Sequence, residues 1–308
     1  MIIWVDANGW PFPPLVLLGC LVAEILYFRG WRVLVKHAQA KEDARAILSV
    51  RLPASDHGAA WWNSWLWRGV FFIGALAVFL LATSAPIDML SGKLFWVHMV
   101  QHLLLLIVMA PLLVASAPFL PMWLGLPQWA RRLIKAVVKP KAMRAFHRAA
   151  YWLRQPAISC AIMIIGIWIW HWPPLYDLAL TNDLIHDWCE HLTFQLVSLL
   201  FWTQIIPSYP LRPRLGYLGR LGLLGIAIAQ NVVLAVVIGF APAPLYIPYI
   251  HLTIAGGLST LQDQQFGAGI MWTFGDLSFG IAISVIFQQW LATQLDETPD
   301  QVEVTAQH

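Results

Sequence analysis

Long apolar stretches dominate the sequence, and each has about the length needed to cross a lipid bilayer as a helix. A bilayer core requires about 20 apolar residues in helical form. Seven stretches qualify, roughly 14–35, 66–84, 94–115, 156–170, 184–206, 217–240 and 269–290. Only 11% of the 308 residues are charged, whereas soluble proteins carry about 25%. We therefore predict an all-α, polytopic membrane helical bundle with seven transmembrane helices.

The segments between and after these stretches indicate how the chain is organised. We expect residues 1–295 to form a single transmembrane domain and the polar residues 296–308 to form a disordered tail. Segment 120–153 is basic and of mixed polarity, which predicts a cytoplasmic segment lying along the membrane surface. Connection 241–268 is nearly uncharged, so it either caps one face of the bundle or enters it as a re-entrant piece. Pro111 is expected to kink the third helix.

The distribution of Lys and Arg predicts the orientation. All but one of the 19 basic residues lie in or beside the first, third and fifth connections. Lys93 is the exception. Because basic connections stay in the cytoplasm, the N-terminus is expected outside and the C-terminus in the cytoplasm. The basic connections then report topology and contact with anionic lipid, and we expect the lipid bilayer, with no nucleic acid, as their partner.

This topology places most of the histidines on the outer side. They are His98, His102, His171, His186, His191 and His251. Pairs four residues apart share one helix face, which applies to His98 with His102 and to His186 with Glu190. At a rise of 1.5 Å per residue, His102 lies roughly 12 Å and His191 roughly 10 Å below the outer ends of their helices. The two groups are predicted to meet in the outer leaflet.

A group of ionisable side chains at one membrane depth favours a metal site. A charged side chain there costs at least about 2.5 kcal/mol and is by default a functional candidate. Imidazole suits copper, zinc and iron, while sulfur ligands favour Cu(I). Cys20, Cys189, Met99 and Met109 lie near the same level, so copper fits the combination best. The alternative is that these histidines only form hydrogen bonds between helices.

Two carboxylates near the outer surface are candidates for a supporting role. We expect Asp263, Asp276 and Cys189 to lie next to the ligand residues without binding the metal themselves. The two carboxylates are expected either to accept hydrogen bonds from ligand histidines or to cap the seventh helix.

Motifs of common enzyme classes are absent from the sequence. It contains no Walker loop, no H-E-x-x-H and no serine nucleophile elbow, and holding a metal requires no turnover, so we expect a protein that is not an enzyme. Two alternatives stay open. One is a haem-binding redox protein with His102 and His191 as axial ligands. The other is a copper transporter with a helix broken at Pro111, although the cytoplasmic halves of the third and fifth helices are almost wholly apolar.

Four segments together resemble the CtaG family of cytochrome c oxidase assembly factors of bacterial inner membranes. They are HMVQH at 98–102 with the following Ala110-Pro111 and Ala117-Pro118, WHWPPLY at 170–176, HDWCEHLTF at 186–194, and DQQ at 263–265 with GIMW at 269–272. The match covers roughly residues 90–275, and the first two helices add nothing to it.

The resemblance implies a seven-helix, multi-pass inner-membrane protein needed to build an active haem–copper oxidase. It further implies a role in supplying copper to cytochrome c oxidase subunits. Carried over by motif, the candidate functional positions are His98, His102, His171, His186, Glu190, His191 and Asp263. Together with the residue chemistry, this predicts a chaperone that binds Cu(I) through the six histidine and glutamate side chains of this set.

Overall fold

The structure is a computed structural model, and it describes residues 14–39, 65–138, 140–182, 184–250 and 258–305. Within these ranges the chain is helical and has no strand. The first half contains α1 (Pro14–Gln39), α3 (Trp65–Ala82), α4 (Ala85–Ser91), α5 (Phe95–Leu103), η2 (Leu104–Met109), α6 (Ala110–Ala115), α7 (Phe119–Gly125), α8 (Gln128–Val137) and α9 (Pro140–Leu153). The second half contains α10 (Pro156–His171), α11 (Pro173–Leu180), η3 (Ile185–Glu190), α12 (His191–Ile205), α13 (Tyr217–Gly239), α14 (Ile247–Ile250) and α15 (Thr260–Thr305).

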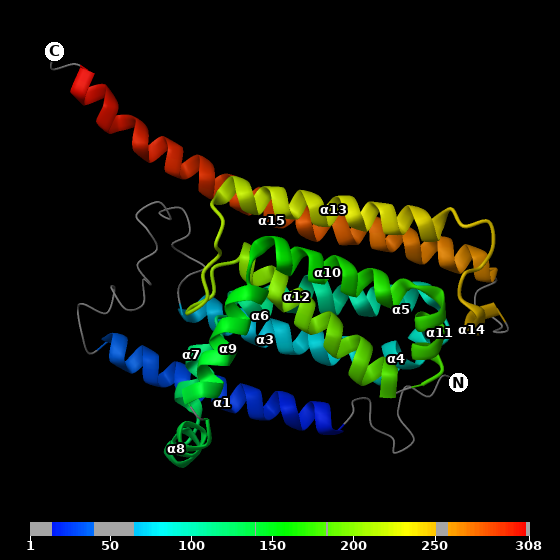
Figure 1. Ribbon diagram of the computed structural model, residues 1–308, viewed down its shortest axis with the longest axis horizontal. Coiled ribbons are helices and arrows are strands. Elements are labelled where there is room, and N and C mark those ends of the chain that lie inside the picture. Colours follow the sequence, from blue (N-terminus) through cyan, green and yellow to red (C-terminus); the bar gives the residue numbers. More distant parts are fainter. Residues whose placement is uncertain (1–13, 40–64, 139, 183, 251–257, 306–308) are drawn as a thin grey trace.

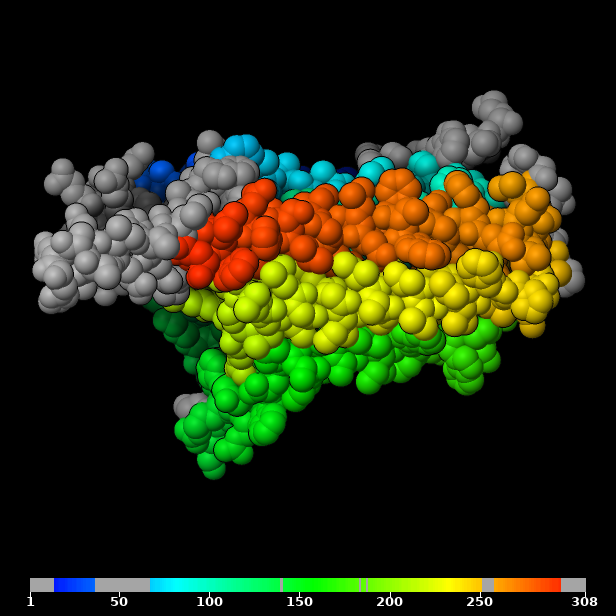
Figure 2. Space-filling view, turned by 90° about the horizontal axis from the view of Figure 1, so that it is seen from above, coloured from blue at the N-terminus to red at the C-terminus, as the bar shows by residue number. Residues whose placement is uncertain are grey.

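The long helices lie side by side as a bundle (Figure 1). In Figure 1, α1 lies along one edge and the α13–α15 pair along the opposite edge, with α3, the α5–η2–α6 rod, α10 and α12 between them. Figure 2 shows α13 and α15 packed along their length on one face. The largest apolar core gathers side chains from η2, α6, α10, α12, α13 and α15, including Phe194, Trp202 and Phe279.

All seven stretches expected from the sequence are helical in the structure. Among the described residues, four helical segments are long and apolar enough to cross a membrane. The number rises to six if the bent pairs α3–α4 (49°) and α9–α10 (79°) each form one span. The η3–α12 stretch is not among them, because polar residues occupy its first two turns. The membrane class is thus supported, while seven spans and their orientation stay predictions.

The third helix adapts to Pro111 by widening into the π-helical η2 just before it. Since proline has no N–H, backbone carbonyls one turn earlier need other donors. Ser198 Oγ donates to the carbonyl of Leu106 over 2.5 Å, and Ser278 Oγ donates to the carbonyl of Ile107 over 2.7 Å. These bonds tie η2 to α12 and α15, so the expected break is a polar junction of three helices.

Two glycines let α1 and α7 cross at very short range. A Cβ atom at Gly30 would lie 1.8 Å from the carbonyl oxygen of Pro121, and one at Gly125 would lie 1.8 Å from that of Leu26. Both distances are far shorter than a van der Waals contact, so neither position can hold a residue with a side chain. The first helix is thereby packed on the segment that follows α6.

Segment 120–153 and the last helix show more detail in the structure than the sequence predicted. Segment 120–153 forms parts of three helices, α7 to α9, and α8 has no buried residue; its membrane-surface placement stays a prediction. The last helix begins at Thr260, nine residues before the expected start, and its backbone stays helical to Thr305, where we expected a disordered tail. The nine added residues at its start, 260–268, include one leucine and three glutamines, which have good helix propensity, so the apolar pattern alone placed the start too late.

Candidate metal centre

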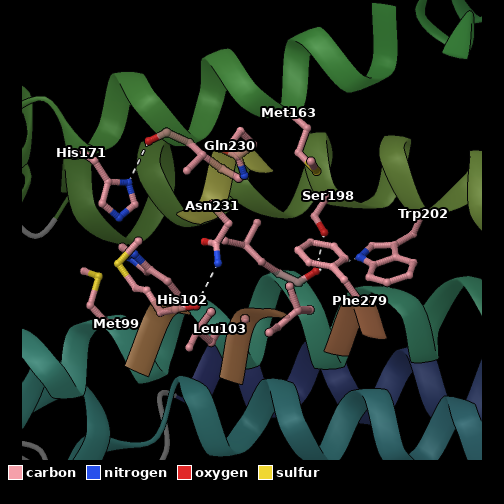
Figure 3. Close-up of a pocket in the computed structure, with 15 residues that line it drawn as sticks. Met99, His102, Leu103, Met163, His171, Ser198, Trp202, Gln230, Asn231 and Phe279 are labelled. Atoms are coloured by element: carbon pink, nitrogen blue, oxygen red, sulfur yellow. Dashed lines mark hydrogen bonds between the residues drawn. The ribbon is translucent and has the colours of Figure 1, made fainter. Parts of the chain in front are cut away.

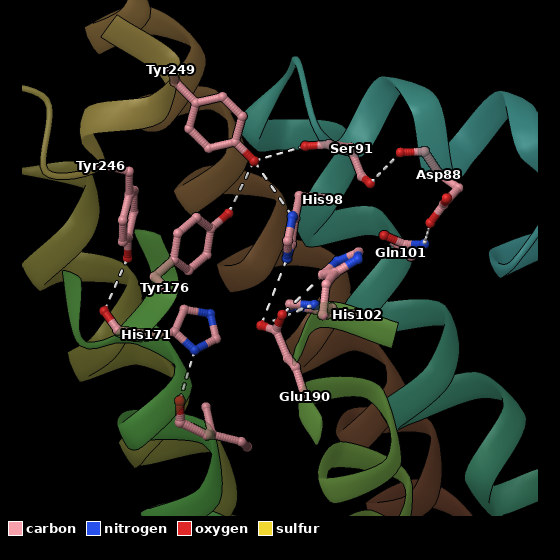
Figure 4. A network of polar contacts seen from close by, with 12 residues as sticks. Asp88, Ser91, His98, Gln101, His102, His171, Tyr176, Glu190, Tyr246 and Tyr249 are labelled. Carbon is pink, nitrogen blue, oxygen red and sulfur yellow. Dashed lines mark hydrogen bonds and ion pairs between the residues drawn. The ribbon is translucent and has the colours of Figure 1, made fainter. Parts of the chain in front are cut away.

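Four of the predicted ligands converge between α5 and η3. Their ligand atoms all lie within 4.8 Å of one another: His98 and His102 on α5, His186 and Glu190 on η3. Glu190 Oε1 lies 3.5 Å from His102 Nε2 and 3.8 Å from His98 Nε2, and Glu190 Oε2 lies 3.9 Å from His186 Nε2. Figure 4 shows the carboxylate pointing at the α5 histidines. The two predicted pairs therefore form one cluster, at the end of the bundle away from α8 and α9 (Figure 1).

The π-helical turn η3 lets neighbouring residues of one segment face the same centre. The backbone N–H of His191 donates to the carbonyl of His186, an i→i+5 bond. This wider turn brings residues five apart onto one face, and the two imidazole rings lie 4.4 Å apart. In a regular α-helix His191 would point about 100° away from Glu190. π-turns are rare and concentrate at functional sites.

The cluster is buried, and several of its central atoms have no hydrogen-bond partner among the described residues. Glu190 and His98 are fully buried, and His102 is 3% exposed. In the described part of the chain, neither oxygen of Glu190, neither nitrogen of His102 and not Nε2 of His98 has a hydrogen bond. Leaving a buried polar group unsatisfied costs about 1–3 kcal/mol, more if charged. Such a concentration of unsatisfied lone pairs is typical of a site built for a ligand.

The spacing of these atoms fits an ion and not a set of direct ion pairs. Charge-assisted N–H···O bonds measure about 2.7–2.9 Å, well below the 3.5–3.9 Å found here. Two ligands about 2.0–2.2 Å from a tetrahedral ion lie about 3.3–3.6 Å apart. The three carboxylate–imidazole separations lie close to this value, while the whole set of four atoms lies within 4.8 Å.

Hydrogen bonds around the cluster fix how His98 presents its ring. Tyr249 Oη donates to the carbonyl of Ser91 over 2.7 Å and lies 3.4 Å from His98 Nδ1. Because the tyrosine hydrogen is already committed, Nδ1–H of His98 is the donor to the tyrosine oxygen. Its Nε2 then carries the lone pair that faces Glu190, the tautomer a metal ligand needs.

His191 and His171 lie beside the group of four. The ring of His191 is 5.7 Å and that of His171 is 6.3 Å from the ring of His102. His171 Nδ1 donates to the carbonyl of Ile167 over 2.8 Å, so its Nε2 holds the lone pair. Both histidines thus border the centre, and the ligand role predicted for them stays a prediction.

Three tyrosines that were not among the predicted site residues line one side of the site, at the end of the bundle. Tyr176, Tyr246 and Tyr249 are each 1% exposed. Tyr246 Oη donates to the carbonyl of His171 over 3.2 Å, and Tyr176 Oη lies 3.3 Å from Tyr249 Oη. The described part of connection 241–268 therefore caps the bundle end. Two tyrosines three residues apart in an otherwise apolar loop were the available signal. His251 lies outside the described residues.

The residues expected around the ligands have other partners. Asp263 is fully buried and accepts the backbone N–H groups of Phe95 (2.7 Å) and Trp96 (3.3 Å). It therefore caps α5, the helix of His98. It also lies in the first turn of α15, as one of its two expected roles requires. Ser259 and Gln262 cap α15 by reciprocal bonds, a capping box.

Of the other two supporting candidates, one is bonded to a neighbouring helix and one is exposed. Asp276 accepts a 3.0 Å bond from Asn231 Nδ2, which joins α15 to α13. Cys189 is exposed, because the turn that directs Glu190 inward directs its neighbour outward. The supporting role predicted for these two residues stays a prediction.

Fold and site together define a helical membrane protein with a buried histidine–carboxylate centre near one end of its bundle. Comparison with known families gives the class a name. The family model of the cytochrome c oxidase caa3 assembly factor, CtaG, matches residues 45–293. The chain belongs to this family, and the resemblance seen in the sequence is confirmed.

More distant relatives occur in mycobacteria. Uncharacterised proteins of Mycobacterium bovis and Mycobacterium tuberculosis are each 24% identical to this chain over 237 residues. One of Mycobacterium leprae is 22% identical over 241 residues. Each alignment covers 74% of this chain but 35% of the relative, so the chain spans about a third of their length. No solved structure matches the chain.

Proposed function

We propose that this chain holds copper, as Cu(I), in the cluster of His98, His102, His186 and Glu190, and delivers it to a haem–copper cytochrome c oxidase. The observation that carries the proposal is the ion-sized separation of four buried ligand atoms, several of them without hydrogen bonds. The family supplies the client, since its members are oxidase assembly factors. Transfer by ligand exchange needs no turnover, so the role is that of a chaperone and not of an enzyme.

Charge balance favours a monovalent ion. Glu190 contributes one negative charge, and ligand histidines bind metal in the neutral form. Cu(I) therefore gives a cluster with no net charge, whereas Zn²⁺ or Cu²⁺ leaves one uncompensated positive charge. Burying an unpaired charge in a low-dielectric interior costs several kcal/mol. The full burial of Glu190 thus selects for Cu(I).

The geometry favours an ion over haem. Axial ligands of haem approach from opposite faces and leave the equatorial plane to the macrocycle. Here the carboxylate of Glu190 and the imidazole of His186 lie within 4.8 Å of the ligand atoms of the two α5 histidines, which leaves no room for a macrocycle between them. The cavity beside them has a volume of about 40 Å³, while pockets for larger organic ligands measure about 300–1,000 Å³.

The proposal includes a place in the membrane. Seven spans, with the N-terminus outside, put the cluster in the outer leaflet of a bacterial inner membrane. The basic helices α8 and α9 then lie at the opposite, cytoplasmic end. Copper held at that depth is reached from the outer side through the cap that Tyr246 and Tyr249 form. An oxidase subunit in the same membrane receives the copper at this cap.

Metal analysis of the purified protein tests the proposal. The protein is produced in copper-supplied cells as wild type, His102→Ala and Glu190→Gln, with His147→Ala as the control, because His147 is exposed on α9. The wild type and the control are expected to retain copper and show no Soret band, while the two cluster variants lose most of it. Equal copper in all four, or a haem spectrum, would overturn the assignment.

Delivery needs a separate measurement. In cells whose own copy is replaced by Glu190→Gln, the assembled oxidase is expected to contain less copper than in cells carrying His147→Ala. If uptake of copper into proteoliposomes accompanies normal oxidase assembly, transport and not chaperoning is the function.

A further inference from the structure

The four-residue cluster leaves one well-oriented histidine unused. The side chain of His171 is buried, with 7% of its surface exposed. Its Nε2 has no hydrogen bond within the described residues. Its orientation is fixed twice, by the bond from its Nδ1 to the carbonyl of Ile167 and by Tyr246 on its own carbonyl. A buried lone pair held this firmly requires a partner.

His171 faces a cavity of about 40 Å³ that begins beside His102. Figure 3 shows Met99 and His102 at the same end of this cavity as His171. Met99 precedes His102 by three residues on α5, so the two side chains are neighbours on one face. Met271 of α15 lines the same cavity. Both thioethers are almost fully buried, at 1% and 5% exposure, in one apolar cluster.

The polar side chains around this cavity are largely committed elsewhere. Both amide hydrogens of Asn231 are used, one on the carbonyl of Met271 and one on Asp276. Ser198 and Trp202 both donate to the carbonyl of Leu106. Gln230 accepts from Trp168 with its oxygen, which leaves its amide nitrogen as a donor that a water molecule in the cavity would use.

We propose that this cavity is a second Cu(I) position, with His171 Nε2 and the thioether sulfurs of Met99 and Met271 as ligands. One imidazole and two thioethers are soft, neutral donors, a set that selects Cu(I) over zinc, magnesium or calcium. The cavity holds more than the 10–15 Å³ that one water needs, so a single ion fits. The inference rests on the proposed function, because it extends the copper centre inward from His102.

A second position gives copper a two-step path. An ion in the histidine–glutamate cluster has a carboxylate ligand, whereas one in the cavity has none and meets only sulfur and imidazole. His102 lies between the two positions and lines both. Transfer exchanges one set of neutral or singly charged ligands for another and needs no oxidant or reductant, because copper stays Cu(I) throughout.

X-ray absorption at the copper edge tests the second position. Full-length protein loaded with Cu(I) alone is expected to bind two ions and to show sulfur scattering at about 2.3 Å beside nitrogen and oxygen. Met99→Leu together with Met271→Leu should halve the copper and remove the sulfur signal. Met109→Leu is the matched control, since Met109 is equally buried in a different apolar cluster and does not line the cavity.

Selenomethionine labelling removes dependence on the folding of the variants. Copper scattering from selenium in the labelled wild type supports the position without any substitution. One ion per chain with only nitrogen and oxygen ligands overturns the second position and leaves the proposed function standing. Failure of the wild type to bind any Cu(I) overturns both.

Discussion

The buried carboxylate of Asp263 is expected to stabilise the metal centre from a distance. It accepts two backbone N–H groups at the start of α5, the helix that carries His98 and His102. A hydrogen bond to a charged group contributes about 1.5–3 kcal/mol, and the bond to Phe95, at 2.7 Å, is the shorter of the two. Because Asp263→Ala also leaves both donors unsatisfied, we expect it to lower the free energy of unfolding by about 3 kcal/mol.

Thermal unfolding in detergent, followed by tryptophan fluorescence, measures this effect. A loss of about 3 kcal/mol corresponds to about 5 °C in Tm for a chain of 308 residues, at an unfolding entropy of about 2.1 cal/mol/K per residue. Asp263→Asn keeps one acceptor oxygen and should lose less. Asp276→Ala is the control on the same helix, because Asp276 accepts one bond from a side chain and should cost about 1 kcal/mol.

Copper binding separates a positioning role from simple destabilisation. Asp263→Ala should weaken Cu(I) binding, since the first turn of α5 would no longer hold its place relative to η3. Asp276→Ala should not. If both variants lower Tm equally, or if Asp263→Ala binds Cu(I) as tightly as wild type, the capping argument is wrong.

Three further outcomes follow from the described contacts. Tyr249→Phe removes the acceptor for His98 Nδ1–H and should weaken Cu(I) affinity about 10–100-fold, measured by competition with a chelator; unchanged affinity would refute the tautomer assignment. Gly30→Ala should prevent close packing of α1 on α7 and reduce folded yield in size-exclusion chromatography, whereas Gly19→Ala, whose Cβ meets nothing within 4 Å, should not. Ser198→Ala breaks one bond at the η2 junction and should lower the unfolding free energy by about 0.6–1.7 kcal/mol in a denaturant titration; a larger loss would mean that the junction is a cooperative network.

The helical pattern and the cluster of four candidate ligands were predictable because both follow from regular periodicities. Apolar length located every long helix of the described chain. The four-residue spacing of His98 with His102, and of His186 with Glu190, placed each pair on one face. Equal predicted depth then suggested that the pairs meet, and the structure places the four side chains in one cluster. Their position near the outer side stays a prediction.

The rest depended on departures from regular geometry and on contacts distant in sequence. The π-turn that swings His191 toward the centre has no simple sequence signature. The partner of Asp263 lies 168 residues away on another helix, so its capping role was not readable locally. Cys189 was placed near the candidate ligands by its depth alone, and depth does not tell on which face of the helix a side chain lies; Cys189 is exposed.

The most direct test of the metal centre is an anomalous difference map at the copper edge from crystals of the Cu(I)-loaded protein. Its strongest site should lie between α5 and η3, about 2.0–2.2 Å from the ligand atoms of His98, His102 and Glu190. A map with no peak in this cluster, or with its strongest peak at the exposed Cys189, would contradict the account.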